Sequence, residues 1–378
     1  MDIENTYEEP DYKIGFTKDG KDFFIASNGG KQMLVLGNRE LKQYDEILYR
    51  AVLLDPSGKI YYVGKEISGN SNNLYLVHGE KEYGKFTDIN SYNVAFDKDN
   101  IPYYSASDEQ GEYPSAQFLV KGNAPISKKF NRGIGEIKIL PNGNIAYTGT
   151  DSLPDGTSVT SLIINGKESA KYPSIFNVKF RQDNTCAFIV TDINNKSFVV
   201  DNNKTVSDMY SYIMNLDISK NGVLTYIATN SGDYDKNIPD DTYYVIGKDK
   251  FGPVNNQYSE RSGPPPVVFN ESGDYVFPAS KDIMVKGESR TKSYLKHKKW
   301  TSELYDFISD INSYDNDFYY TGVNYQDNGS NSNQLYKNSK KLSDEYVIMN
   351  NYKFEKISGT ITFTGMRKNT IYFVEITL

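Results

Sequence analysis

The chain has 378 residues, of which 42 are Lys or Arg and 49 are Asp or Glu, giving a net charge of −7. Bulk charge does not draw a mildly acidic protein of this kind to nucleic acid or anionic membranes, so we expect no nucleic-acid partner. No apolar run reaches the roughly eighteen residues of a membrane-spanning helix, and we expect no membrane insertion. The single cysteine, Cys186, cannot form an internal disulfide.

Residues 1–13 precede the first repeat and contain Tyr7. The opening Met-Asp-Ile-Glu-Asn is not a secretory leader. Two compartments fit this start: the cytosol, or an exported location reached by a chain whose leader has been trimmed and replaced by a Met. The close fit of residue 1 to the first predicted strand favours the exported, periplasmic interpretation, and the localisation stays open.

A short phrase then recurs nine times: a tight turn, a strand with an aromatic residue, and a small residue two places later, as in Pro141-Asn-Gly-Asn-Ile-Ala-Tyr-Thr-Gly149. Turn pairs such as Asn142-Gly143 tolerate the positive φ that two-residue hairpins require. Side chains two apart share a strand face, so each strand offers one large and one small group to the same neighbour. The aromatic column is Phe24, Tyr62, Tyr104, Tyr147, Phe188, Tyr226, Phe277, Tyr320 and Phe363. The small residues are Ala26, Gly64, Ala106, Gly149, Val190, Ala228, Ala279, Gly322 and Gly365.

Each repeat reads as four short strands, and the aromatics recur at spacings of 38 to 51 residues. This period predicts an all-β chain, a single β-propeller domain over 1–378. The count is nine four-stranded blades, with eight as the runner-up, and the fifth and eighth repeats are the least regular. The ninth repeat lacks a fourth strand, which residues 1–13 would supply, closing the ring and removing an open sheet edge. The blades are approximately 14–49, 50–91, 92–134, 135–175, 176–213, 214–262, 263–308, 309–350, and 351–378 with 1–13.

The segments 54–62, 218–226 and 269–277 resemble the bacterial TolB-like propeller repeat, which opens each blade with a phenylalanine, a Ser-Pro-Asp-Gly-Lys phrase, an apolar residue and an aromatic. The resemblance implies a bacterial propeller, often exported, that usually serves as a binding or scaffold module. The chain departs from the family in lacking a separate N-terminal domain and in having more than six repeats. The Trp-Asp pair of WD40-like repeats is absent, since Trp300 is followed by Thr301.

The connections between second and third strands vary in length, and variable loops on a regular scaffold commonly carry binding. The long ones are 66–73, 108–117, 151–160, 230–242 and 324–334. These loops and the links between blades are expected on one face of the propeller, which is therefore predicted to be acidic and rich in Tyr and Asn. The short turns between first and second strands and between third and fourth strands form the opposite, plain face. Lys236 is almost the only opposing charge expected on the acidic face. The acids are Asp108, Glu109, Glu112, Asp151, Asp155, Asp233, Asp235, Asp240, Asp241 and Asp327.

Within these loops, Asp233, Asp235, Asn237 and Asp241 have the spacing of a propeller calcium loop, which makes Ca²⁺ the one cofactor considered. Ile238 stands where such a loop has Gly, so a solvated acidic loop is the alternative. Residues 263–266, Gly-Pro-Pro-Pro, predict a stiff interblade link, with a polyproline ligand as the alternative.

The basic run 292–299 is placed on the outer strand of the seventh blade, where lysines discourage edge pairing. A patch for an acidic partner is the alternative. His78 is expected in a turn and His297 on an outer strand, neither beside a nucleophile motif. We therefore identify no catalytic and no cofactor-binding residue.

The pattern as a whole indicates a non-enzymatic binding or scaffold propeller. We expect a protein partner at the loop face and a monomeric chain, and a small ligand in the central channel stays open. The alternative is a propeller hydrolase or lyase that uses paired loop carboxylates at that channel.

Overall fold

The computed structural model describes residues 15–48, 52–69, 71–109, 115–232, 240–254, 265–285, 287–326, 330–355, 359–367 and 370–378. These residues form strands, turns and bends, and within them no helix has the length and apolar character needed to cross a membrane. The chain divides into two compact units, Met1–Phe176 with Gln182–Asn184, and Asn177–Arg181 with Thr185–Leu378. Each unit is described by itself below.

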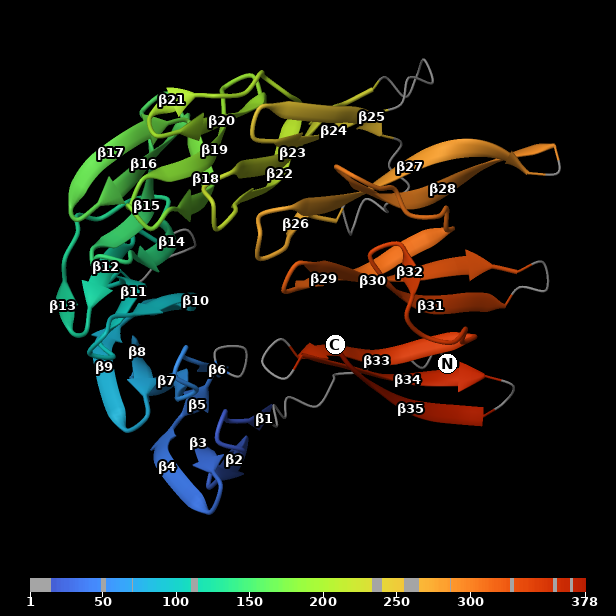
Figure 1. The fold of residues 1–378 in the computed structure, drawn as a ribbon. Coiled ribbons are helices and arrows are strands. Elements are labelled where there is room, and N and C mark those ends of the chain that lie inside the picture. Colours follow the sequence, from blue (N-terminus) through green and yellow to red (C-terminus); the bar gives the residue numbers. More distant parts are fainter. Residues whose placement is uncertain are drawn as a thin grey trace, which may run out of the picture. The chain divides into compact units, whose positions relative to one another are not determined.

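The first unit contains four antiparallel sheets in its described residues, coloured blue to green in Figure 1. Sheet 1 has β1 (Gly15–Phe16), β2 (Asp22–Asn28), β3 (Lys31–Leu36) and β4 (Arg39–Tyr44). Sheet 2 has β5 (Glu46–Ile47), β6 (Leu53–Leu54), β7 (Ile60–Ser68), β8 (Ser71–His78) and β9 (Lys81–Phe86). Sheet 3 has β10 (Asp88–Phe96), β11 (Pro102–Ser107), β12 (Phe118–Lys121) and β13 (Ala124–Pro125). Sheet 4 has β14 (Ile134–Ile139), β15 (Ile145–Ser152), β16 (Ser158–Ile164) and β17 (Lys167–Tyr172).

Five more sheets follow, the first of which begins with a strand that crosses the boundary between the units. Sheet 5 has β18 (Ser174–Phe180), β19 (Cys186–Thr191), β20 (Ser197–Asp201) and β21 (Lys204–Thr205). Sheet 6 has β22 (Tyr212–Ile218), β23 (Leu224–Asn230), β24 (Asp241–Ile246) and β25 (Asp249–Val254). Sheet 7 has β26 (Val268–Phe269), β27 (Tyr275–Val285) and β28 (Glu288–His297). Sheet 8 has β29 (Phe307–Tyr314), β30 (Asp317–Tyr325), β31 (Asn331–Lys337) and β32 (Lys340–Lys341), and sheet 9 has β33 (Ile348–Glu355), β34 (Thr360–Arg367) and β35 (Thr370–Thr377).

The described part of the chain thus has one sheet for each sequence repeat, and the all-β fold class is confirmed. Sheets 5 and 8, the least regular in sequence, are both complete and four-stranded. Three sheets depart from four strands in the described residues: sheet 2, whose first strand is split into β5 and β6, and sheets 7 and 9, which have three strands each. Residues 1–14 lie outside the described residues, so the nine-bladed closed ring, and with it the single domain 1–378, stays a prediction.

The aromatic column forms the centre of the sheets. Eight of its members are at most 5% exposed, and only Phe24 is half-buried. The small residue two places later makes room for an aromatic side chain from the last strand of the preceding sheet. Tyr44 lies edge-on to Tyr62, with ring centroids 6.2 Å apart, and a Cβ built on Gly64 would lie 2.6 Å from the Tyr44 ring. The same knob-in-hole contact recurs at Phe130 on Gly149, Tyr305 on Gly322 and Tyr346 on Gly365.

Two further periodic features position these aromatic knobs. A serine three residues earlier accepts the N–H of the neighbouring third strand, at 2.8 to 3.0 Å, which holds the short last strand in register. These serines are Ser127, Ser207, Ser302 and Ser343. A buried isoleucine then follows the aromatic knob by three or four residues and lies at the start of the first strand of the next sheet. These are Ile47, Ile89, Ile134, Ile175, Ile213 and Ile308.

The third strands contain a second column of buried residues. Each of its members pairs with the residue that directly follows the column aromatic on the second strand. In sheets 1 to 8 its members are at most 1% exposed. They are Leu34, Leu76, Leu119, Leu162, Val199, Tyr244, Leu295 and Leu335. In sheet 9 the same register places Phe373 opposite Thr364, and Phe373 is 75% exposed.

The expected outer-strand position of the basic run is wrong. The basic run 292–299 lies mainly on β28, the third strand of sheet 7, and residues 301–305 follow alongside it through the bridges Ser293–Tyr305 and Lys296–Thr301. In sheet 6, the pairing of Val254 with Thr242 puts Val254 in the position that an aromatic knob holds in other sheets. Val254 is smaller than an aromatic, and it packs in one cluster with Ala279, which occupies the hole position of sheet 7.

Candidate functional site

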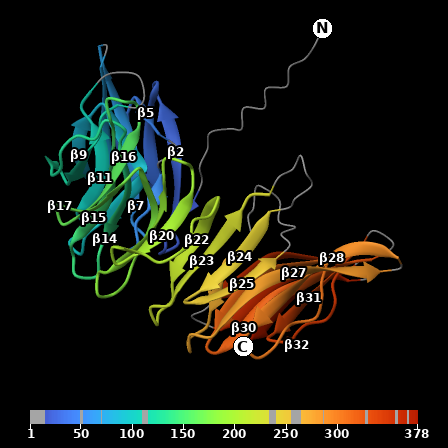
Figure 2. The ribbon, with the colours of Figure 1, turned by 90° about the horizontal axis from the view of Figure 1, so that it is seen from above.

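The connections between second and third strands are mainly long, tightly paired hairpins, not open loops. β7 and β8 remain paired to Ser68–Ser71, β15 and β16 to Ser152–Ser158, and β30 and β31 to Tyr325–Asn331. The β27–β28 hairpin, which reaches the pair Val285–Glu288, projects beyond its neighbours in Figures 1 and 2. These segments looked like loops because both faces of the extended strands meet solvent, which removes the apolar alternation of a half-buried strand.

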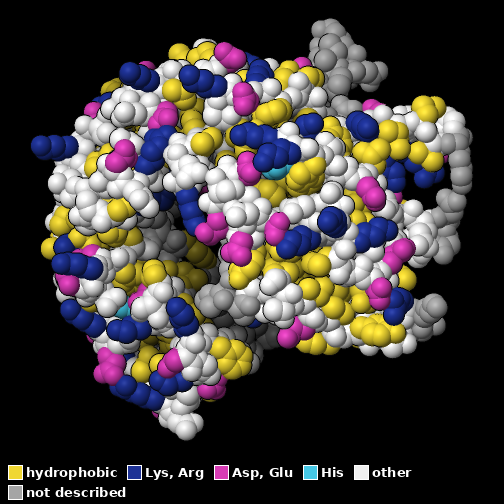
Figure 3. Space-filling view, in the orientation of Figure 1, with side chains coloured by type: hydrophobic (Ala, Val, Ile, Leu, Met, Phe, Trp, Pro, Cys, Tyr) yellow, Lys and Arg dark blue, Asp and Glu magenta, His cyan; other side chains and the backbone are white. Residues whose placement is uncertain are grey.

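The acidic residues at these ends are partly neutralised by lysines that the sequence did not connect to them. Lys128 Nζ lies 2.7 Å from Asp151, and Lys129 Nζ lies 2.7 Å from Asp108 and 2.9 Å from Glu109. Burial raises the pKa of Asp151, but its hydrogen bonds with Lys128 and the Asn131 N–H outweigh burial and hold it below the ordinary value. Figure 3 shows acidic and basic side chains interspersed over the face in view.

The calcium-loop residues Asp233, Asp235 and Asn237 lie outside the described residues, as do Glu112 and Asp327. Asp241 begins β24, and Asp240 accepts a 2.7 Å hydrogen bond from the N–H of Gly232. No group of three or more His, Cys, Asp or Glu with metal-binding geometry occurs among the residues that the structure describes. The calcium site stays a prediction.

The hairpin tips carry exposed apolar side chains, which sequence reasoning did not single out. Five sheets each expose one at the second-to-third connection: Ile67 (55%), Leu153 (43%), Ile193 (76%), Met284 (70%) and Tyr325 (61%). Exposed apolar side chains that recur at the same end of several sheets are the feature from which a contact surface can be proposed.

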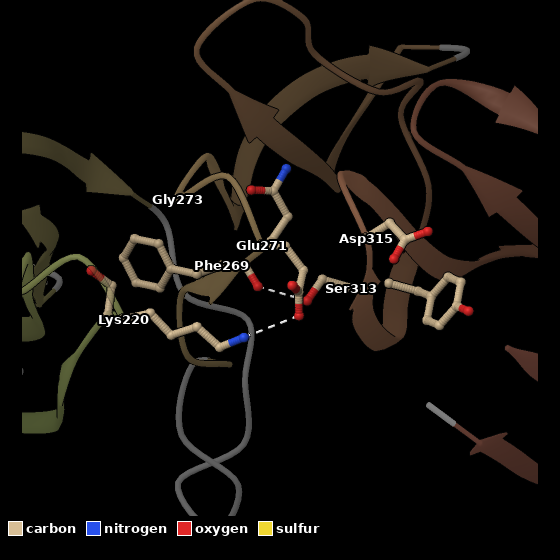
Figure 4. Close-up of a pocket in the computed structure, with 9 residues that line it drawn as sticks. Lys220, Phe269, Glu271, Gly273, Ser313 and Asp315 are labelled. Atoms are coloured by element: carbon tan, nitrogen blue, oxygen red, sulfur yellow. Dashed lines mark hydrogen bonds and ion pairs between the residues drawn. The ribbon is translucent and has the colours of Figure 1, made fainter. Parts of the chain in front are cut away.

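A cavity of about 350 Å³ lies at the other end of the sheets, within the second unit. It is formed by the turns between first and second strands of sheets 6, 7 and 8, which the sequence had assigned to the plain face. Figure 4 shows Lys220 reaching Glu271, with 3.0 Å between Nζ and Oε1, and Ser313 donating a 2.6 Å hydrogen bond to the carbonyl of Phe269. The residues that line the cavity are Ser219, Lys220, Phe269, Asn270, Glu271, Gly273, Ser313, Tyr314 and Asp315.

The turns of sheets 7 and 8 are joined by hydrogen bonds to main-chain carbonyls. The N–H of Glu271 donates to the carbonyl of Asp315 at 2.8 Å, and the Asn270 side chain donates to the carbonyl of Asn316 at 2.9 Å. Asn270 Oδ1 also accepts the N–H of Asp274 at 2.9 Å, which closes its own turn. The lining side chains therefore start from fixed backbone positions.

Both histidines have structural partners. His78 ends β8, so its expected place in a turn is wrong, and its Nε2 lies 2.7 Å from Asp55 Oδ2 with both side chains buried. His297 occupies the same register in sheet 7, on the third strand where an outer strand was expected, and stacks on Trp300 with ring centroids 5.1 Å apart. Burial raises the pKa of the Cys186 thiol to about 11, which makes it a poor nucleophile.

No family model matches the sequence, and no curated protein matches it. Among solved structures, the β-propeller domain of the Trilobed protease from Pyrococcus furiosus is similar at 12% identity, covering 62% of this chain and 79% of that chain, with a TM-score of 0.34. A puromycin-hydrolysing peptidase of Mycobacterium tuberculosis is similar at 10% identity, covering 94% of this chain and 57% of its own, with a TM-score of 0.31. BBS1N in complex with ARL6DN is similar at 10% identity, covering 78% of this chain and 90% of that chain, with a TM-score of 0.30.

Because TM-scores this low carry no weight by themselves, the class of protein rests on the sheets. Successive four-stranded antiparallel sheets, most of them joined by a short link and packed through an aromatic knob of one sheet on the small residue in the second strand of the next, are propeller blades. The chain is a β-propeller protein.

Proposed function

We propose that this protein is a non-enzymatic binding or scaffold propeller of the TolB-like kind, which recognises a protein partner through the tips of its second-to-third-strand hairpins. The observation that carries the proposal is the repeated exposure of one large apolar residue at those tips, among them Ile193, Met284 and Tyr325. Apolar anchors on rigid supports, ringed by polar residues, are the usual centres of protein recognition.

The polar surroundings suit the same role. The tip of β30–β31 carries Gln326 and Ser330, joined by a 2.8 Å main-chain hydrogen bond, and that of β15–β16 carries Asp155 and Thr157. Short polar side chains of this kind hydrogen-bond a partner without competing ion pairs. The rival hydrolase or lyase needs free carboxylates, whereas Asp108 and Asp151 are tied to lysines.

The test is capture of partners from a lysate of the source organism by the full-length protein and two matched variants. One variant replaces Met284 and Tyr325 by Ser at the tips of adjacent sheets. The control replaces Phe16, 67% exposed at the opposite end of its sheet, by Ser. We expect a specific protein to be held by wild type and Phe16→Ser and lost from the tip variant. Equal capture by all three, or capture by none, would reject the proposal.

A further inference from the structure

The cavity at the turns of sheets 6, 7 and 8 has features of a ligand site that the hairpin-tip proposal does not use. Its walls come from three successive repeats, and its base is held by the bonds from Ser313 to Phe269 and from Glu271 to Asp315. A site whose backbone is already cross-linked loses little entropy when it binds. Its volume, about 350 Å³, is that of a small-molecule or single-side-chain pocket.

The charges in the cavity do not balance. Lys220 is paired with Glu271 at 3.0 Å, which leaves the Asp315 carboxylate as the excess charge. Asp315 makes no ion pair within 4.0 Å with any residue that the structure describes, and its φ of 50° fixes it in a tight turn between Tyr314 and Asn316. One positive and two negative groups therefore give the lining an affinity for a cation.

Two half-buried aromatic side chains, Phe269 and Tyr314, also line the cavity. Aromatic faces attract organic cations, and a planar cation can stack on them while it donates hydrogen bonds in its own plane. A divalent metal fits less well, because hard cations require six or more oxygen ligands. One of the two lining carboxylates is already paired, and the side chains of Asn270 and Ser313 are engaged in hydrogen bonds to the main chain.

We propose that this cavity binds a guanidinium group, with Asp315 accepting its paired N–H donors, the open side of Glu271 accepting a further donor, and Phe269 or Tyr314 stacking on its plane. A guanidinium matches a carboxylate with two parallel hydrogen bonds, which an ammonium cannot form. The ligand is a free guanidino compound or an arginine side chain of a peptide, and the two share this chemistry.

The proposal is tested by calorimetric titration of the full-length protein with N-acetyl-arginine methylamide, with methylguanidine, and with the neutral isostere N-acetyl-citrulline methylamide. We expect the arginine derivative to bind, and the citrulline derivative to bind at least about tenfold more weakly, since it keeps the shape and loses the charge. Binding of methylguanidine with similar affinity identifies a free guanidino compound as the ligand type, and much tighter binding of the arginine derivative identifies a peptide side chain.

Asp315→Asn is the informative variant, because Asn tolerates the same left-handed backbone and removes only the charge. It should weaken binding about tenfold or more. Asp99→Asn is the control: Asp99 precedes Asn100 as Asp315 precedes Asn316 in the sequence repeat, it is not among the residues that line the cavity, and its replacement should leave affinity unchanged. No binding of the arginine derivative, equal binding of the citrulline derivative, or equal effects of the two substitutions would overturn the proposal.

Discussion

The packing of Phe130 on Gly149 makes a quantitative prediction about the interface between sheets 3 and 4. A Cβ built on Gly149 would lie 2.3 to 2.6 Å from three carbons of the Phe130 ring. Carbon atoms in contact prefer about 3.5 to 4.0 Å, so the ring has to retreat by more than about 1 Å in an already close-packed region. Overpacking of this kind typically costs about 1–3 kcal/mol, and we expect Gly149→Ala to lower the free energy of unfolding by that amount.

The assay is urea denaturation followed by circular dichroism, applied to wild type, Gly149→Ala, Phe130→Leu and the double variant. Because Leu occupies less space than Phe above the strand, the new methyl group should cost less in its presence. The double variant should therefore be more stable than the sum of the single effects predicts, by about 0.5–3 kcal/mol. A Gly149→Ala protein as stable as wild type, or a cost that is the same in the Phe130→Leu background, would refute the knob-in-hole account.

Three further outcomes are expected. Burial raises the pKa of Asp55, but hydrogen bonds from Ser57, Lys59 and His78 outweigh burial and leave the pKa below its ordinary value. The ionised Asp55 therefore stabilises the folded protein at any pH above the pKa of an unfolded-state Asp, about 3.9, and this stabilisation is lost as the pH falls through the lower pKa of the folded state. Asp55→Asn should thus lower the free energy of unfolding by about 1–3 kcal/mol at pH 7. In denaturant titrations the difference between wild type and variant should shrink below about pH 4, and a difference that does not change with pH contradicts this. The closed nine-bladed ring predicts that Phe373 is covered, so that Phe373→Ala lowers the unfolding free energy by about 3–5 kcal/mol, and a loss below about 0.5 kcal/mol argues against closure. The calcium-loop hypothesis predicts that chelator-treated protein releases heat with Ca²⁺ in calorimetry and that Asp235→Ala abolishes it; absence of heat in the unaltered protein removes the site.

Much of the fold was predictable because its strongest signal is periodic. The aromatic and small residues recur at one register, and eight of the nine aromatics are buried as that register requires. The partner of the small residue was not identified, since the last strands are short and poorly patterned. Tyr44 and Gly64 are twenty residues apart, and only the fold shows that the ring of one fills the space left by the other. The repeated Ser-x-x-aromatic phrase, for instance Ser343 to Tyr346, was the available signal.

Function-related positions were harder to predict, for two physical reasons. Solvated hairpins such as β7–β8 lack a buried face, so their residues look like loop. The cavity brings together Lys220, Glu271 and Asp315 from turns in three different repeats, and the register between adjacent repeats decides which of these side chains meet. That register depends on the packing of whole sheets, which no local pattern in the chain records.

The short link between an aromatic knob and the next buried isoleucine also bears on how such a chain changes length. Tyr305 and Ile308 are three positions apart, yet Tyr305 completes one sheet and Ile308 opens the next. A gene duplication with both breakpoints in such links inserts one entire repeat. It carries one new knob and one new hole, and it leaves every existing interface with its original partners. Growth or loss by whole repeats is therefore structurally conservative, whereas an insertion of a few residues in the link separates two groups that must pack together.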